Sequence, residues 1–160
     1  MTSLADGCVL DASVALAVTL NESLRDSAQA TVAAVAHGVG RLVAPTLFDV
    51  ECASGVVKAV RQGRLRADLW VEAWLGLLDL PVERISSPTA VFQGIQLALE
   101  SGVSAYDAVY VALADELELP LVTADARLVR ALAGSPHAIL YVGDVDLSGP
   151  PPRRSHARSG

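Results

Sequence analysis

Short apolar runs alternate along this chain with longer segments that place apolar residues at helical spacing. The apolar runs have the length of strands buried on both faces, and they cover residues 7–10, 42–44, 78–82, 119–122 and 138–142. The helical segments are at about 13–20, 23–36, 46–62, 66–77, 88–100, 105–118 and 126–133. This alternation predicts an α/β domain with a mostly parallel sheet and right-handed crossovers.

Boundary residues agree with these elements. Ser87 followed by Pro88 is typical of a helix start, and residues 104–107 have the form of a capping box. We find no internal repeat, so we expect a single domain over residues 1–147. Residues 148–160 are rich in proline and arginine, and we interpret them as a flexible basic tail.

Four acidic residues stand at the ends of predicted strands or the starts of predicted helices: Asp11, Glu51, Asp107 and Asp125. In an open parallel sheet, strand ends and the adjoining helix starts meet at one edge. The surrounding motifs contain no lysine or arginine, so an ion-pair network is a poor explanation. Carboxylates gathered in this way suit a hard cation such as Mg²⁺ or Mn²⁺. The pattern therefore predicts metal-assisted phosphodiester chemistry.

Each acid also has an ordinary structural alternative. Asp11 and Asp125 follow strands and could cap the next helix, and Asp107 could complete a capping box. Glu51 is flanked by apolar residues on both sides, which argues against a merely solvated position. Asp49 is the more ordinary neighbour, because an acid in a first turn suits the helix dipole.

The net charge of −6 argues against indiscriminate nucleic-acid binding through a basic surface. Aromatic residues make up 4%, too few for an extended base-stacking platform. One basic cluster interrupts the acidic chain, and it is either a solvated helix end or a set of phosphate contacts: Lys58, Arg61, Arg64 and Arg66.

The remaining composition points to the cytoplasm. No apolar run reaches the roughly 18 residues that span a membrane, and residues 1–7 lack the basic start of a signal peptide. Cys8 and Cys52 lie in apolar runs, as buried free thiols of a reducing compartment do.

Four motifs together resemble the PIN-domain proteins, especially the VapC-type ribonuclease toxins of type II toxin–antitoxin pairs. In order and spacing the motifs are VLDAS at 9–13, PTLFDVE at 45–51, SAYDA at 104–108 and VTAD at 122–125. The resemblance covers about residues 7–142. It implies that Asp11, Glu51, Asp107 and Asp125 are the catalytic, metal-binding acids, and that Ser13 and Thr123 are supporting hydroxyls.

The same resemblance implies a PIN-like three-layer fold with helices on both faces of a five-stranded sheet of order 3-2-1-4-5. It also implies Mg²⁺ or Mn²⁺ dependence, endonucleolytic cleavage of RNA, homodimers and a cognate antitoxin. A metal-free ribonuclease would instead need histidines as acid and base. We reject that mechanism, because His37, His137 and His156 fall in a helix end, a loop and the tail, away from the motifs.

Other α/β classes fit less well. A haloacid-dehalogenase-type phosphatase expects a second Asp where this chain has Ser13, and a response-regulator receiver needs a lysine after its last strand. Dinucleotide binding would require G-x-G-x-x-G after the first strand, where residues 11–14 read DASV. The alternative that stays open is a catalytically silent PIN-like module that holds RNA or a protein partner without cutting.

Overall fold

The computed structural model describes residues 4–20, 23–38 and 40–147. The predicted tail at 148–160 lies outside these residues, as does His156. Within the described ranges, no helix has the length and apolar character needed to cross a bilayer.

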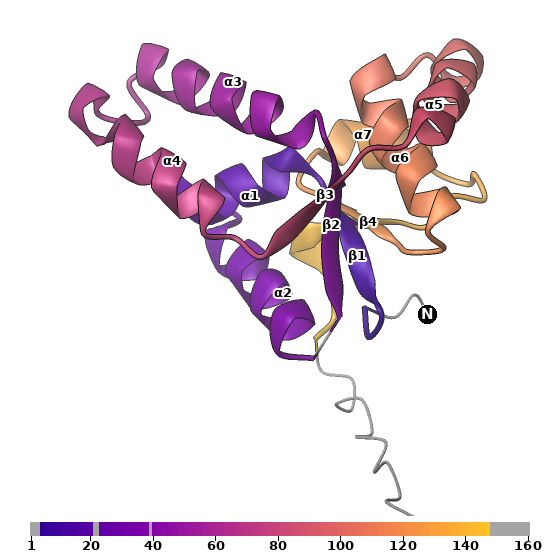
Figure 1. The fold of residues 1–160 in the computed structure, drawn as a ribbon, viewed down its shortest axis with the longest axis horizontal. Helices are drawn as coiled ribbons and strands as arrows, with labels where there is room; N and C mark the ends of the chain where they lie inside the picture. The colour runs from indigo at the N-terminus through magenta and orange to yellow at the C-terminus, as the bar shows by residue number, and fades with distance from the viewer. Residues whose placement is uncertain (1–3, 21–22, 39, 148–160) are drawn as a thin grey trace, which may run out of the picture.

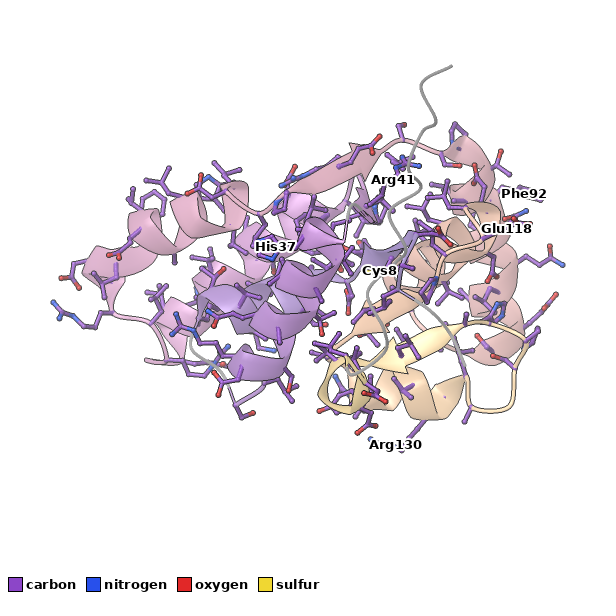
Figure 2. All side chains as sticks on the ribbon, turned by 90° about the horizontal axis from the view of Figure 1, so that it is seen from below. Cys8, His37, Arg41, Phe92, Glu118 and Arg130 are labelled. Carbon is purple, nitrogen blue, oxygen red and sulfur yellow. The ribbon has the colours of Figure 1, made fainter. Side chains whose placement is uncertain are left out.

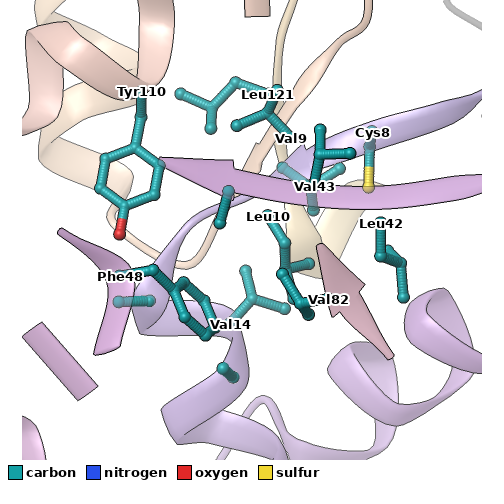
Figure 3. Close-up of a cluster of buried hydrophobic side chains, with 14 of the residues drawn as sticks. Cys8, Val9, Leu10, Val14, Leu42, Val43, Phe48, Val82, Tyr110 and Leu121 are labelled. Atoms are coloured by element: carbon teal, nitrogen blue, oxygen red, sulfur yellow. The ribbon is translucent and has the colours of Figure 1, made fainter. Parts of the chain in front are cut away.

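Five parallel strands form one sheet with the order β3-β2-β1-β4-β5, which confirms the expected order. The strands are β1 (Gly7–Leu10), β2 (Arg41–Pro45), β3 (Val82–Ile85), β4 (Leu121–Thr123) and β5 (Ile139–Tyr141). The centre of the sheet is the centre of the core, since Val9 of β1 pairs with Val43 on one side and Leu121 on the other. All three side chains are fully buried (Figure 3).

Helices cover both faces of the sheet and complete three layers (Figure 1). Four helices lie on one face: α1 (Ala12–Thr19), α2 (Arg25–His37), α3 (Phe48–Arg61) and α4 (Trp70–Leu78), with the short η1 (Ala67–Leu69) before α4. The other face carries α5 (Pro88–Ser101), α6 (Ala105–Glu116) and α7 (Ala126–Ala131), and η2 (Val142–Asp144) follows β5. The predicted α/β class with helices on both faces is confirmed.

The third strand differs from the prediction. We expected it at 78–82, whereas β3 runs from Val82 to Ile85 and Leu78 is the last residue of α4. Ala73 and Leu77 of α4 are buried at helical spacing, so this apolar run continues the helix rather than starting a strand. As an edge strand, β3 carries the polar residues Glu83 and Arg84, which a strand buried on both faces would lack.

Two glycines allow the helices that carry the site to pack closely. A Cβ on Gly55 of α3 would come within 2.3 Å of the Leu16 side chain of α1. A Cβ on Gly94 of α5 would come within 3.1 Å of the Val109 backbone of α6. A side chain at either position would force its neighbour to shift, so these glycines allow α3 to lie close to α1 and α6 close to α5.

Candidate active site

Asp11 lies at the carboxyl end of β1, between the branches of the sheet that run to β2 and to β4. This is the switch point at which open α/β sheets bind ligands. Its backbone N–H donates to the Val122 carbonyl at 3.0 Å, which joins it to β4. The side chain is 8% exposed and makes no helix-capping hydrogen bond, so the capping role considered from the sequence is wrong.

Two hydroxyls hold the Asp11 carboxylate. Ser13 and Thr123 both donate to Oδ2, at 2.6 and 2.7 Å. The Ser13 hydroxyl also accepts from the Ala124 N–H at 2.9 Å, and the Thr123 hydroxyl accepts from the Asp125 N–H at 3.0 Å. The supporting hydroxyls predicted from the resemblance are thus bonded to the acid they were expected to orient, and they tie it to the turn after β4. Both hydroxyls thus bond to the same carboxylate oxygen.

Burial raises the pKa of Asp11. The hydrogen bonds from Ser13 and Thr123 lower it, and the charge of Asp107 raises it further. A buried carboxylate beside a like charge is harder to ionise than a free acid, and a cation at Oδ1 would remove this penalty.

Glu51 lies one turn into α3 and reaches the same region. Burial raises its pKa, the nearby Tyr110 hydroxyl lowers it, and the charges of Asp11 and Asp107 raise it further. Its Oε2 is buried and has no hydrogen-bond partner among the described residues. A buried carboxylate oxygen without a donor is unusual in a folded protein, and it is what a cation ligand requires.

Asp107 stands in the first turn of α6, where Ser104 caps the helix. The Ser104 hydroxyl accepts from the Asp107 N–H at 3.1 Å and donates to Asp107 Oδ2 at 2.7 Å. Asp107 is partly exposed, and its charge contributes to the raised pKa of both Asp11 and Glu51. Asp107 therefore completes the capping box of α6, as considered from the sequence. It also lies near enough to Asp11 and Glu51 to affect their pKa.

Asp125 caps α7, as its alternative reading predicted. Its Oδ1 accepts from the N–H groups of Arg127 and Leu128, at 2.8 and 3.4 Å. The Arg127 side chain approaches the same oxygen at 3.6 Å, although it is largely exposed and the pair is weakly held. The charge of Asp125 does not contribute to the raised pKa of Asp11 or Glu51. Asp125 therefore stands at the same edge in a more peripheral position.

The acids at this edge have the chemistry of a divalent-cation site, but their side chains are not gathered into one. Among the described residues, no three acidic, histidine or cysteine side chains are gathered closely enough to enclose a metal ion as they stand. The chemistry of the set nevertheless fits, because Asp11, Glu51 and Asp107 are oxygen donors that repel one another and Glu51 Oε2 lacks a donor.

The basic cluster is not part of this arrangement. Lys58 lies about two turns after Glu51, roughly 10 Å along the axis of α3. Arg66 is paired with Asp68 at 2.6 Å, and the Nε of Arg64 donates to Gln62 at 3.0 Å. The basic residues lie in the last turn of α3 and just after it, at the end of the helix that points away from the sheet (Figure 1).

Two histidines lie within the described residues, and neither shifts the pKa of the acids at the carboxyl edge. His37 ends α2, and His137 Nδ1 lies 2.7 Å from Asp115 at the far end of α6.

Asp49 was expected to be an ordinary acid of a first helical turn, and its carboxylate is bound by Arg84 at 2.8 Å. That arginine stacks over Phe48, which gives Asp49 a structural partner outside the acidic group.

Sequence reasoning missed Tyr110. Residues 108–114 read as a uniformly apolar, buried stretch of helix, and all seven are indeed buried. Yet the Tyr110 hydroxyl lies beside Glu51, and it is buried without a hydrogen-bond partner in the described part of the chain. The signal was its position three residues after Asp107, which places both side chains on one face of α6.

A cavity of about 240 Å³ also opens near this edge of the sheet. It lies among the ends of β2 and β3 and the helices α5 and α6, and Leu47, Ile85 and Val109 are among its lining residues. None of the four acids lines it, and its wall is mainly apolar. The cavity is therefore separate from the carboxylate group.

Known proteins resemble this chain in sequence and in fold. The PIN domain family matches residues 8–133. VapC ribonuclease Mb0985 of Mycobacterium bovis is 40% identical over 120 residues, which is 75% of this chain and 87% of that protein. Ribonuclease VapC12 of Mycobacterium tuberculosis is 34% identical over 123 residues, covering 77% of this chain and 90% of that protein.

Solved structures share the fold. PAE2754 from Pyrobaculum aerophilum has a TM-score of 0.62 at 24% identity, covering 87% of this chain and 86% of that one. A toxin–antitoxin complex from Klebsiella pneumoniae has a TM-score of 0.58 at 16% identity, covering 85% of this chain and 98% of the matched chain. At these identities the likeness concerns the fold alone.

Proposed function

Because this chain belongs to the PIN-domain family, and within it to the VapC type, we propose that it is a metal-dependent endoribonuclease. We propose further that it is the toxin of a toxin–antitoxin pair and acts on RNA in the cytoplasm. The names of its sequence relatives, which are ribonucleases, support this proposal.

The observation that carries the proposal is the electrostatic coupling of three carboxylates at the carboxyl edge of the sheet. Asp11, Glu51 and Asp107 come from three different elements, and like charge contributes to the raised pKa of Asp11 and of Glu51. A fold gains nothing from such repulsion unless a cation occupies the group.

We assign Asp11 Oδ1, Glu51 Oε2 and Asp107 as the groups that would hold Mg²⁺ or Mn²⁺. Asp125 would be the fourth acid to hold the cation. It would do so through Oδ2, because its helix cap uses Oδ1. Bound there, the cation would lower the pKa of a water and offset the negative charge of the phosphate. Ser13 and Thr123 keep the Asp11 carboxylate oriented, and Ser104 does the same for Asp107.

The basic residues after the middle of α3 would contact RNA away from the reacting phosphate. The carboxylate group does not include the four basic residues, which are Lys58, Arg61, Arg64 and Arg66. Their role is therefore to hold the RNA backbone rather than to assist bond cleavage. Replacing Lys58 and Arg61 by alanine together should raise KM and weaken its salt dependence, with kcat little changed.

The decisive experiment is incubation of the pure protein with end-labelled RNA, with Mn²⁺ or with EDTA. We expect internal cleavage with Mn²⁺ that leaves 5′-phosphate and 3′-hydroxyl ends, and no cleavage in EDTA. Asp11→Asn and Glu51→Gln should each lower the rate by about 100-fold or more, because each removes a cation ligand. Asp49→Asn is the matched control, since it removes an acid from the same helix turn as Glu51 and should keep most of the activity.

Cleavage that is equally fast in EDTA, or that Asp11→Asn leaves unchanged, would refute the site assignment. RNA that is bound but never cut, with all acids intact, would instead favour the silent binding module.

Two exposed apolar surfaces support the proposed protein partners. The first, the α4 surface, consists of Trp70, Val71, Leu75 and Leu78 on a helix that packs beside α3. The second, the α5 surface, consists of Val91, Phe92, Ile95 and Leu99, and Figure 2 shows Phe92 pointing outward from that helix. Apolar patches of this kind mark protein interfaces.

We propose that the α4 surface binds an amphipathic helix of the antitoxin, which places an arginine or lysine among the carboxylates. We assign the α5 surface to the homodimer. Trp70→Glu should abolish inhibition by a co-expressed antitoxin and leave the dimer intact, whereas Phe92→Glu should give monomers that the antitoxin still binds. Each variant is the control for the other, and light scattering with an RNA-cleavage assay reads out both. Equal behaviour of the two variants would contradict the assignment.

A further inference from the structure

The Tyr110 hydroxyl is a buried polar group to which the described fold assigns no hydrogen bond. Tyr110 is 1% exposed, and its hydroxyl has no hydrogen-bond partner among the described residues. Buried tyrosine hydroxyls are normally hydrogen-bonded. In Figure 3 the ring of Tyr110 extends from α6, and its hydroxyl points toward the start of α3 near Phe48.

The group facing this hydroxyl is Glu51, one turn beyond Phe48 on α3. Glu51 Oε2 is likewise buried and without a donor in the described part of the chain. The two groups are close enough that Tyr110 lowers the pKa of Glu51, yet no hydrogen bond of regular geometry joins them. A donor and an acceptor that both lack partners thus lie side by side at the edge of the carboxylate group.

The other two acids of the group show what is missing at Glu51. Asp11 is held by the hydroxyls of Ser13 and Thr123, and Asp107 is held by the hydroxyl of Ser104. Glu51 Oε2 has no such bond within the described ranges, and the side-chain hydroxyl that contributes to the pKa of Glu51 is that of Tyr110. Carboxylates that bind metal ions are in turn hydrogen-bonded by neighbouring groups, which fix their orientation.

We propose that Tyr110 is a positioning residue, whose hydroxyl donates a hydrogen bond to the Glu51 carboxylate when the acidic group closes on its divalent cation. This proposal rests on the proposed metal site. The bond forms between two side chains already in place, so it needs a small shift of Glu51 rather than a rearrangement of α3 or α6. It gives the third acid the hydroxyl support that the other two have.

The competing explanation is that Tyr110 is an aromatic core residue whose hydroxyl has no role. Its ring belongs to the main buried cluster, together with Phe48 and Val14. Tyr110→Phe keeps this packing and removes only the oxygen. The matched control is Tyr106→Phe, which makes the same chemical change in the same helix at a side chain that is 66% exposed.

Three measurements on the purified full chain test the proposal: Mn²⁺ affinity by calorimetry without RNA, the melting temperature in EDTA, and kcat and KM on a short RNA. Tyr110→Phe should weaken Mn²⁺ binding about tenfold, the lower end of the usual effect of such supporting groups. It should melt in EDTA at or above the wild-type temperature, because the metal-free fold loses no hydrogen bond. We expect kcat to fall with little change in KM, and Tyr106→Phe to match wild type throughout.

A double-mutant cycle with Glu51→Gln makes the test specific. If Tyr110 acts through Glu51, then Tyr110→Phe should cause no further loss of Mn²⁺ affinity in the Glu51→Gln background. An additive loss in that background would overturn the proposal. So would Mn²⁺ affinity within twofold of wild type, or a loss of affinity matched by a lower melting temperature in EDTA, which indicates a structural role.

The calorimetric arm separates this proposal from the proposed function. If the wild-type protein binds Mn²⁺ but cuts no RNA, a tenfold loss in Tyr110→Phe still supports the positioning role while the ribonuclease assignment fails. If the wild-type protein cuts RNA and Tyr110→Phe binds Mn²⁺ normally, the positioning role fails alone. A wild-type protein that binds no divalent cation overturns both.

Discussion

Replacing Asp107 by asparagine should stabilise the metal-free protein and weaken its response to metal. The substitution keeps the shape of the side chain, and the amide oxygen can still accept the Ser104 hydroxyl that Asp107 Oδ2 accepts at 2.7 Å. It removes the charge that raises the pKa of Asp11 and of Glu51. The fold therefore loses a repulsive contribution while its helix start is preserved.

The size of the effect follows from the two charge pairs. Unit charges 4 Å apart repel by about 4 kcal/mol at an effective dielectric of about 20. Asp107 is partly exposed and bonds to Ser104 rather than to either acid, so we take roughly 1 kcal/mol for each pair. A domain of this size shifts by about 2–4 °C per kcal/mol. We expect Asp107→Asn to melt about 4–8 °C above wild type in EDTA at neutral pH.

Metal should raise the melting temperature of the wild-type protein by more than that of the variant and so remove most of this difference. At a free Mn²⁺ concentration about 100 times the dissociation constant, the wild-type protein gains roughly 2.7 kcal/mol. The variant lacks one ligand, binds about 10–100-fold more weakly and gains only about 0.4–1.4 kcal/mol at the same concentration. The assay is a pair of melts for each protein, in EDTA and in Mn²⁺, with Glu72→Gln on the exposed side of α4 as the control.

If Asp107 only serves its helix start, the outcome is different. The variant would lose about 0.5–2 kcal/mol in EDTA and respond to Mn²⁺ as fully as wild type. That result would refute the placement of Asp107 in a cation site.

Further predictions concern Asp125 and pH. Asp125→Ala should lower stability by about 1 kcal/mol because α7 loses its cap, whereas Asp125→Asn, also a good cap, should melt like wild type; equal melting of the two variants would contradict the capping geometry. Burial raises the pKa of Asp11 and Glu51 in the folded state, so ionising them costs stability as the pH rises from the ordinary acid pKa of about 4 through the raised values. In EDTA the melting temperature should therefore fall as the pH is raised from about 4 to neutral. Asp11→Asn should reduce this fall, and an unchanged fall would argue against a strained Asp11.

Much of the site could be predicted because parallel topology converts sequence order into spatial proximity. Asp11 and Thr123 are far apart in sequence, yet each lies at or just after the end of a strand, and β1 pairs directly with β4. Once the alternation of strands and helices predicts a parallel sheet, strand ends must share an edge. The position of these residues then follows without knowledge of any side-chain contact.

The division of labour among the acids did not follow from the sequence. Asp11 and Asp125 occupy the same kind of position after a strand, but the first accepts two hydroxyl bonds and caps nothing, whereas the second caps α7. The Asp11 carboxylate has the Ser13 and Thr123 hydroxyls as donors, whereas the Asp125 carboxylate has the first N–H groups of α7. The motifs contain the hydroxyls but do not show which of the two acids they bond to.

The two errors of interpretation have a common cause. Leu78 was assigned to a strand and Tyr110 to a featureless core helix because both lie in apolar runs. Hydropathy describes each side chain as a whole. It therefore did not distinguish a strand from the helical spacing of Ala73 and Leu77, with which α4 ends. It also did not register the one hydroxyl oxygen in which the chemistry of Tyr110 resides. A buried tyrosine three residues after an acid on a helix start has its hydroxyl near whatever that acid faces. In this fold the acid faces Glu51, so the apolar run that packs α6 into the core also carries the hydroxyl that completes the support of the third carboxylate.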